Sequence, residues 1–107
     1  MRQVRHPLVL GDVIGIFDHI LKTTQGDLGA AERRLDEIDD LLAAIAANPA
    51  SGARLAGPLA GWLVRHGGRR HMITVVFRGD LQAGVIHIAL IAFGARNWLS
   101  EAVDRRL

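Results

Sequence analysis

The chain has 107 residues, half of them apolar and only 5% aromatic, and it contains no cysteine. This length suits a single domain over residues 1–107, with one core built from Ala, Val, Ile and Leu. The lack of cysteine excludes disulfide bonds, a thiol nucleophile and thiolate metal sites. No signal-peptide core or membrane span follows the basic segment Met1–His6. We therefore expect a cytoplasmic protein with no membrane partner.

Charge is divided unevenly along the chain. Residues 1–50 carry five basic and eight acidic side chains, whereas residues 51–107 carry eight and three. Between positions 54 and 96 there are six arginines and a single acid, Asp80; the arginines are Arg54, Arg65, Arg69, Arg70, Arg78 and Arg96. We expect these arginines to bind an anionic partner, either phosphate or an acidic protein surface. The alternative is a solvated face that serves solubility.

The first half of the chain predicts one strand and two helices. Gln3–Val9 contains Pro7, which favours an edge strand. Asp12 is expected to cap a helix, because apolar residues at helical spacing follow it: Val13, Ile16, Phe17, Ile20 and Leu21. Gly26 ends this helix, and Asp27 caps a second one.

The second helix has an apolar seam on one side and acids on its other faces. The seam advances in steps of three and four residues and ends before Asn48: Leu28, Ala31, Leu35, Ile38, Leu42 and Ile45. The acids are Glu32, Asp36, Glu37, Asp39 and Asp40. A short connection makes the two helices an antiparallel hairpin, whose seam needs a covering layer.

Three apolar runs in the second half predict that layer. After a loop over Ala50–Gly61, the runs are Trp62–Arg65, His71–Arg78 and Val85–Phe93. Turns at Gly67–Gly68 and Gly79–Gly84 are too short for crossovers, so these strands pair antiparallel. The expected fold class is α+β: an N-terminal strand, a helical hairpin, then a three-stranded antiparallel sheet packed on the hairpin in two layers.

The order of elements and four local strings resemble the ParE/RelE superfamily of toxins from bacterial type II toxin–antitoxin (plasmid stabilisation) systems. The strings are Asn48–Gly52, Leu55–Leu59, Gly68–Ile73 and Gly94-Ala95-Arg96. The resemblance covers nearly the whole chain. It implies a small two-layer toxin with a RelE/ParE-like fold. A cognate antitoxin, whose C-terminal segment wraps around the toxin, would hold it inactive. The toxin could form a homo-oligomer or a hetero-oligomer with the antitoxin.

The superfamily contains two mechanisms. RelE-like members are ribosome-dependent endoribonucleases that cleave messenger RNA. The residues of this chain that match the basic positions of the RelE-like motifs are Arg65, Arg70 and Arg96. Their guanidinium groups could stabilise the transition state of phosphodiester cleavage. The usual proton-transfer residue near the C-terminus is not matched, because the chain has no Tyr and no His after His87. His71, beside the arginines, is the one base that could replace it.

ParE-like members inhibit DNA gyrase by binding it, which requires no proton-transfer residue. Their long helical hairpin and the Pro7–Ile20 segment resemble this chain more closely. The favoured function is therefore gyrase inhibition by a non-enzymatic toxin. The ribonuclease and a non-toxic relic that only binds antitoxin are the alternatives.

The remaining conspicuous residues are two tryptophans and a pair of glycines. Trp62 and Trp98 either close the core or line an antitoxin-binding groove. Gly67–Gly68 joins two strands and does not open a helix, so it is no phosphate-binding loop. No histidine pair has metal-ligand spacing, and neither a metal nor another cofactor is expected.

Overall fold

The computed structural model describes residues 1–94 and 96–107, so Ala95 of the Gly94–Arg96 string lies outside the described residues. The fold class is α+β, as expected, with a five-stranded sheet and three helices among the described residues. The elements in chain order are β1 (Arg2–Arg5), α1 (Val9–Thr23), α2 (Leu28–Ala47), β2 (Ala53–Arg54), η1 (Gly57–Leu59), β3 (Leu63–Gly67), η2 (Arg69–His71), β4 (Ile73–Asp80), β5 (Val85–Phe93) and α3 (Trp98–Asp104), where η marks short 3-10 turns.

The sheet has the order β1-β5-β4-β3-β2. The last three strands pair antiparallel, and β1 lies at an edge, so both expectations are confirmed. β1 runs parallel to β5 and ends at Arg5, earlier than the expected Val9. The backbone turns at Pro7, which has no N–H to continue the ladder. The two-residue strand β2 is a correction, since it lies inside the expected loop Ala50–Gly61.

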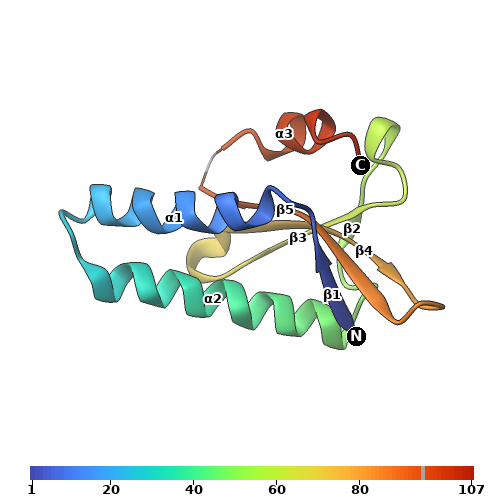
Figure 1. Ribbon diagram of the computed structural model, residues 1–107, viewed down its shortest axis with the longest axis horizontal. Helices are drawn as coiled ribbons and strands as arrows, with labels where there is room; N and C mark the ends of the chain where they lie inside the picture. The colour runs from blue at the N-terminus through green and yellow to red at the C-terminus, as the bar shows by residue number, and fades with distance from the viewer. Residues whose placement is uncertain (95) are drawn as a thin grey trace.

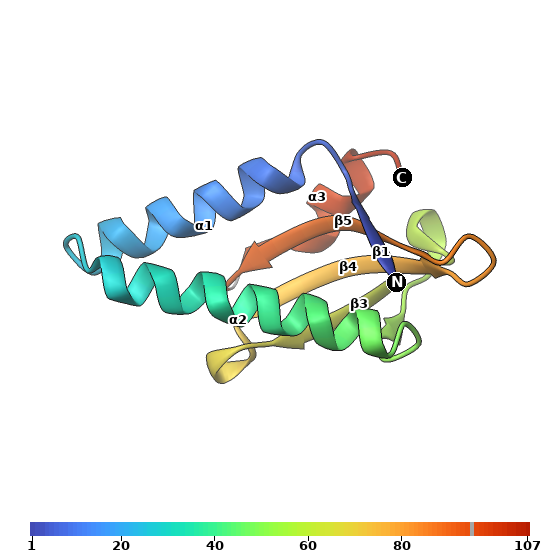
Figure 2. The same cartoon turned by 60° about the horizontal axis from the view of Figure 1, so that its bottom comes forward.

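The helices α1 and α2 lie side by side along one face of the sheet (Figure 1; Figure 2). The side chain of Asp27 caps α2 as predicted, accepting a hydrogen bond from the backbone N–H of Ala30 at 3.0 Å. Most of the predicted seam is buried against the sheet, namely Ala31, Ile38, Leu42 and Ile45. Leu35 is half-buried, and Leu28, at the first position of the helix, is 53% exposed.

The second face of the sheet is also covered, which corrects the expectation of two layers. The helix α3, which the sequence analysis did not foresee, packs on this face together with η1 (Figure 1). Between them they bury a second core: Leu59, Trp62, Val64, Val76, Ala89, Leu90, Ala92 and Ala102. The sequences of β4 and β5 indicate this second covering layer, because nearly continuous apolar runs are typical of strands buried on both faces.

Asp12 does not cap α1, which is a second correction. The helix begins at Val9, so Asp12 lies within its first turn, and its side chain is buried. There Oδ2 accepts a hydrogen bond from the backbone N–H of Ile91 in β5 at 3.0 Å. β1 leaves β5 after Ile88, so this carboxylate takes the place of the missing strand.

None of the helices in the described ranges combines the length and apolar character needed to cross a bilayer.

Candidate functional site

Three basic residues form an exposed turn between β3 and β4. We call Arg69, Arg70 and His71 the basic turn; the side chains of all three are exposed. Arg70 and His71 have φ angles of 57° and 55°, in the left-handed region that non-glycine residues rarely adopt. Such strained conformations persist only where neighbouring structure enforces them, and they cluster at functional sites.

The neighbouring structure that holds the basic turn comes from α2. The backbone N–H of Arg69 donates to Oε1 of Glu37 at 2.9 Å, and Oε2 of Glu37 pairs with Nε of Arg34 at 2.6 Å. Gly68, which precedes the turn, has φ +73°, and a Cβ added there would lie 2.7 Å from Cδ1 of Ile73. Only glycine fits this position without a shift of its neighbour.

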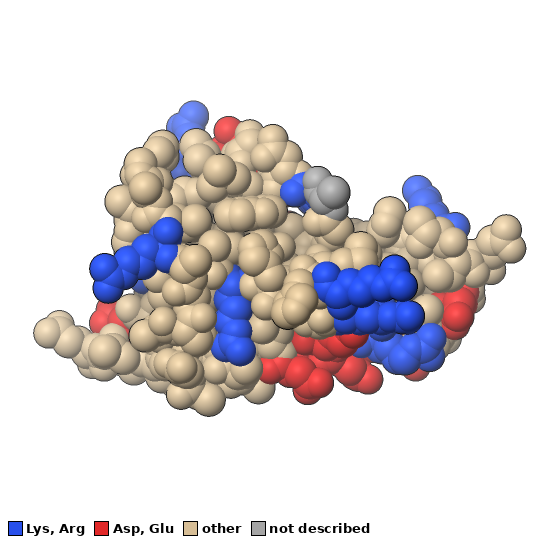
Figure 3. Space-filling model, turned by 180° about the vertical axis from the view of Figure 1, so that it is seen from behind, with Lys and Arg blue, Asp and Glu red and all other residues tan. Residues whose placement is uncertain are grey.

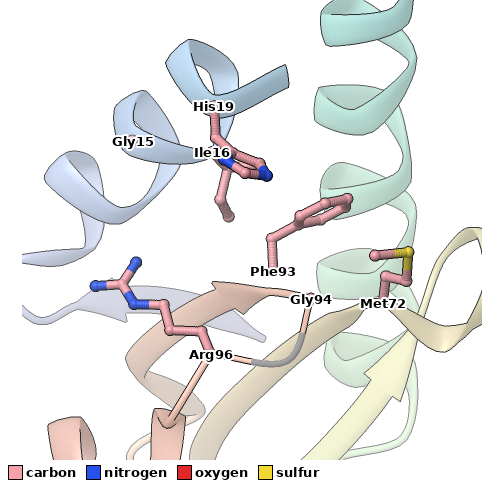
Figure 4. Close-up of a pocket in the computed structure, with 7 residues that line it drawn as sticks. All are labelled: Gly15, Ile16, His19, Met72, Phe93, Gly94 and Arg96. Carbon is pink, nitrogen blue, oxygen red and sulfur yellow. The ribbon is translucent and has the colours of Figure 1, made fainter. Parts of the chain in front are cut away.

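A groove adjoins the basic turn at the same end of the sheet. Its cavity of about 580 Å³ lies between α1 and the end of β5 (Figure 4). The described residues that line it are Gly15, Ile16, His19, Met72, Phe93, Gly94 and Arg96. Met72 directly follows the turn, and its carbonyl accepts from the N–H of Gly94 at 2.8 Å. The rings of His19 and Phe93 have centroids 6.1 Å apart.

Among the described residues, no strand lies beside β5 where it passes the groove. Because Gly94 donates to the β4 side, the backbone N–H and C=O of Phe93 point to the opposite edge, past the end of β1. The backbone N–H of Ile91, two residues earlier, is already taken by Asp12. An open edge beside apolar side chains suits an extended peptide that adds as a strand.

The structure separates the six predicted arginines. Arg69, Arg70 and Arg96 lie at the end of the sheet that carries the groove, where Nε of Arg96 pairs with Oε1 of Glu101 at 2.6 Å. Arg65 lies in the middle of β3, and its Nη1 donates to Oγ of Ser51 at 2.8 Å. Arg54 lies towards the opposite end of the sheet, beside Leu63.

Arg78 also lies at that far end, with its Cζ 4.8 Å from the ring centroid of Trp62. Figure 3 accordingly shows basic side chains in several separate groups on one face of the molecule.

The two tryptophans both take part in the second core. Trp62 is 9% exposed and packs within it, and Trp98, the first residue of α3, packs half-buried against it. Asn97 caps α3 by accepting from the N–H of Ser100 at 3.4 Å. Closing the second core is therefore one role of both indoles.

His66, predicted from the sequence only as a surface or packed histidine, lies on the face of the second core. Its Nδ1 lies 2.8 Å from Oγ1 of the buried Thr74, and its ring meets that of Trp98 edge-on, with centroids 6.0 Å apart. The alternation of side chains along β3 could have predicted this position, because His66 lies two residues after the apolar Val64 and therefore on the same face. His71, the base chosen from the sequence, instead lies in the exposed basic turn.

Comparison with known proteins identifies no family: no family model matches the chain, and no curated protein is detectably similar to it.

Proposed function

We propose that the chain is the toxin of a type II toxin–antitoxin system, of the ParE-like branch, and that it inhibits DNA gyrase by binding. The observation that carries the proposal is the order of elements: an edge strand, a helical hairpin and three antiparallel strands, with the first strand parallel to the last. The strings that resemble the ParE/RelE superfamily fall at junctions of this arrangement. Gly68–Ile73 spans the basic turn, and Gly94–Arg96 follows β5.

The antitoxin's place in this proposal is the groove. Its free edge at Phe93 offers backbone hydrogen bonds to an extended segment, and Met72 and Ile16 offer apolar contacts. His19 and Arg96 add polar side chains to the groove, and Arg96 is already paired with Glu101. A peptide bound there would also lie beside the basic turn, so that one segment could cover the surface that engages the target.

Binding is favoured over RNA cleavage because the expected groups for proton transfer are missing. The sequence has no Tyr, and its one lysine, Lys22, lies in α1. Arg65, the basic residue expected on the sheet, donates a hydrogen bond to Ser51 and lies apart from the basic turn. A gyrase inhibitor needs complementary charge and shape but no general acid.

One observation favours the ribonuclease as a second candidate. The pair of His66 and Thr74 lies on a sheet face at the same end of the molecule as Arg96. A neutral imidazole held by a hydroxyl group can act as a base near neutral pH. The His66 ring is exposed, so RNA could reach it.

The test measures both activities of the purified chain. We expect inhibition of DNA supercoiling by gyrase and no cleavage of messenger RNA on programmed ribosomes. Arg70→Ala should weaken the inhibition, whereas Arg33→Ala, an exposed arginine of α2, serves as the matched control. Cleavage without gyrase inhibition would establish the second candidate. Neither activity, with antitoxin binding retained, would identify a non-toxic relic.

A further inference from the structure

A second basic cavity lies far from the basic turn, on the sheet face that carries α3. Val4, His87 and Arg78 are register partners on β1, β5 and β4, so their side chains form a row across one face of the sheet. Trp62 continues the row beside Arg78. The cavity over this row measures about 290 Å³.

Three of the described residues that line the cavity carry basic side chains on this face, and no described Asp or Glu lines it: the three are His6, Arg78 and His87. Arg5 also lines the cavity, but it alternates with Val4, so its side chain lies on the opposite face, where Nη2 donates to Oε1 of Gln3 at 3.4 Å. Leu107 lines the cavity as well. Within the described part of the chain, Arg78 forms no ion pair with an Asp or Glu side chain. The charge of Arg78 is therefore not neutralised by an Asp or Glu side chain.

Two of these groups are held in place by contacts of their own. The indole of Trp62 supports the guanidinium of Arg78 at 4.8 Å, a cation–π contact that leaves the N–H edges of the guanidinium available. Nδ1 of His6 accepts from the backbone N–H of Leu8 at 3.1 Å, so the neutral ring carries its proton on Nε2 and is a donor there. The cavity thus gathers donors from the end of β1, from β4 and from β5.

We propose that this cavity binds the phosphate group of a small phosphate monoester. Several hydrogen-bond donors from separate strands suit a tetrahedral dianion with three free oxygens better than a planar carboxylate. The paired N–H groups of an arginine guanidinium also match the spacing of two phosphate oxygens. A volume of about 290 Å³ has room for the phosphate with one small attached group, such as a sugar. The site goes beyond the proposed toxin function and does not depend on it.

The experiment is a titration followed by NMR of the arginine Nε–H and histidine ring signals. The probes are inorganic phosphate, ribose 5-phosphate as a monoester and dimethyl phosphate as a diester. We expect saturable shifts at Arg78 and His87 with ribose 5-phosphate, and affinity at least tenfold weaker for dimethyl phosphate. Arg78→Ala should reduce the affinity for ribose 5-phosphate at least tenfold, and Arg33→Ala should leave it unchanged.

Two further variants guard against a folding artefact. Arg78→Lys keeps the charge but lacks the paired N–H groups of the guanidinium, and His87→Gln leaves Arg78 unchanged. Each substitution should weaken binding several-fold while the amide spectrum stays dispersed. Equal loss in Arg33→Ala would overturn the proposal. So would shifts that never saturate, or a diester that binds as tightly as the monoester.

Discussion

Arg105 and Asp12 form a buried, two-pronged ion pair that ties the end of α3 to the first turn of α1. Nη1 of Arg105 lies 2.7 Å from Oδ2 of Asp12, and Nη2 lies 2.5 Å from Oδ1. The side chains are 8% and 4% exposed, respectively. The same two side chains also form hydrogen bonds with the backbone of β5. Arg105 donates to the carbonyl of Ala89 at 2.8 Å, and Asp12 accepts from the N–H of Ile91.

The position of this pair follows from an irregularity in the sheet. Val76 pairs with Leu90 and Phe77 with Ile88, so Ala89 is an extra residue in β5. This bulge lies just where β1 ends, and it leaves backbone groups of β5 without a neighbouring strand. The ion pair satisfies those groups from two helices whose residues lie 93 positions apart.

The first prediction concerns this pair. Arg105→Ala should lower the free energy of unfolding by about 3–5 kcal/mol, because it leaves the buried charge of Asp12 uncompensated. The double variant Asp12→Ala with Arg105→Ala should cost much less than the sum of the two single changes. Urea denaturation of the four proteins measures the coupling. Additive losses would contradict a direct interaction.

The second prediction concerns the seam of α2. Leu42 is 2% exposed and belongs to the first core, so Leu42→Ala should cost about 2–5 kcal/mol. Asp39, on the same helix but exposed, provides the control, and Asp39→Ala should cost less than about 0.5 kcal/mol. Denaturant midpoints compare the two. Similar losses would mean that the buried side of α2 is misassigned.

The third prediction compares two glycines that have positive φ angles. Gly68 and Gly84 have similar φ angles of +73° and +64°, but a Cβ has open space only at Gly84. Gly84→Ala should cost about 1–2 kcal/mol from the left-handed backbone alone. Gly68→Ala should cost about 1–3 kcal/mol more, because its backbone (φ 73°, ψ −173°) lies in a region essentially limited to glycine and its Cβ would meet Ile73. Equal losses in thermal melts would contradict this prediction.

The fourth prediction concerns chemistry at the arginines. If the chain cleaves RNA, Ala at Arg65, Arg70 or Arg96 should each remove about 2.7–4 kcal/mol of transition-state stabilisation, a loss of roughly a hundredfold to a thousandfold in rate. We expect instead no cleavage by the unmutated protein. His71→Ala and His66→Ala are measured alongside on ribosome-bound messenger RNA. Cleavage that depends on either histidine would replace the gyrase proposal.

The fifth prediction concerns the partner segment. A cognate antitoxin at a hundredfold excess over its dissociation constant should stabilise the chain by about 2.7 kcal/mol. Gly15→Leu should abolish this gain by filling the groove, whereas Gly11→Leu should keep it. Both glycines lie in α1, where an added Cβ would meet open space, but only Gly15 lines the groove. An unchanged midpoint with antitoxin, or equal effects of the two substitutions, would contradict this site.

Local patterns were enough to predict much of the first layer. The spacing of Ala31, Ile38, Leu42 and Ile45 predicted the buried side of α2, and Asp27 predicted its cap. The bounds of β5 matched the apolar run Val85–Phe93. These features depend on residues within a few positions of one another, where periodicity and capping act.

The tertiary structure alone decided the features that depend on distant residues. Asp12 reads locally as a helix cap, yet its partners Ile91 and Arg105 reach it only once β5 and α3 are in place. Likewise Arg65 and Arg70, close in sequence, separate because one lies within a strand and the other in a strained turn held by Glu37. Burial of a charge and the grouping of side chains at a site are properties of the packed chain, so no local pattern contains them.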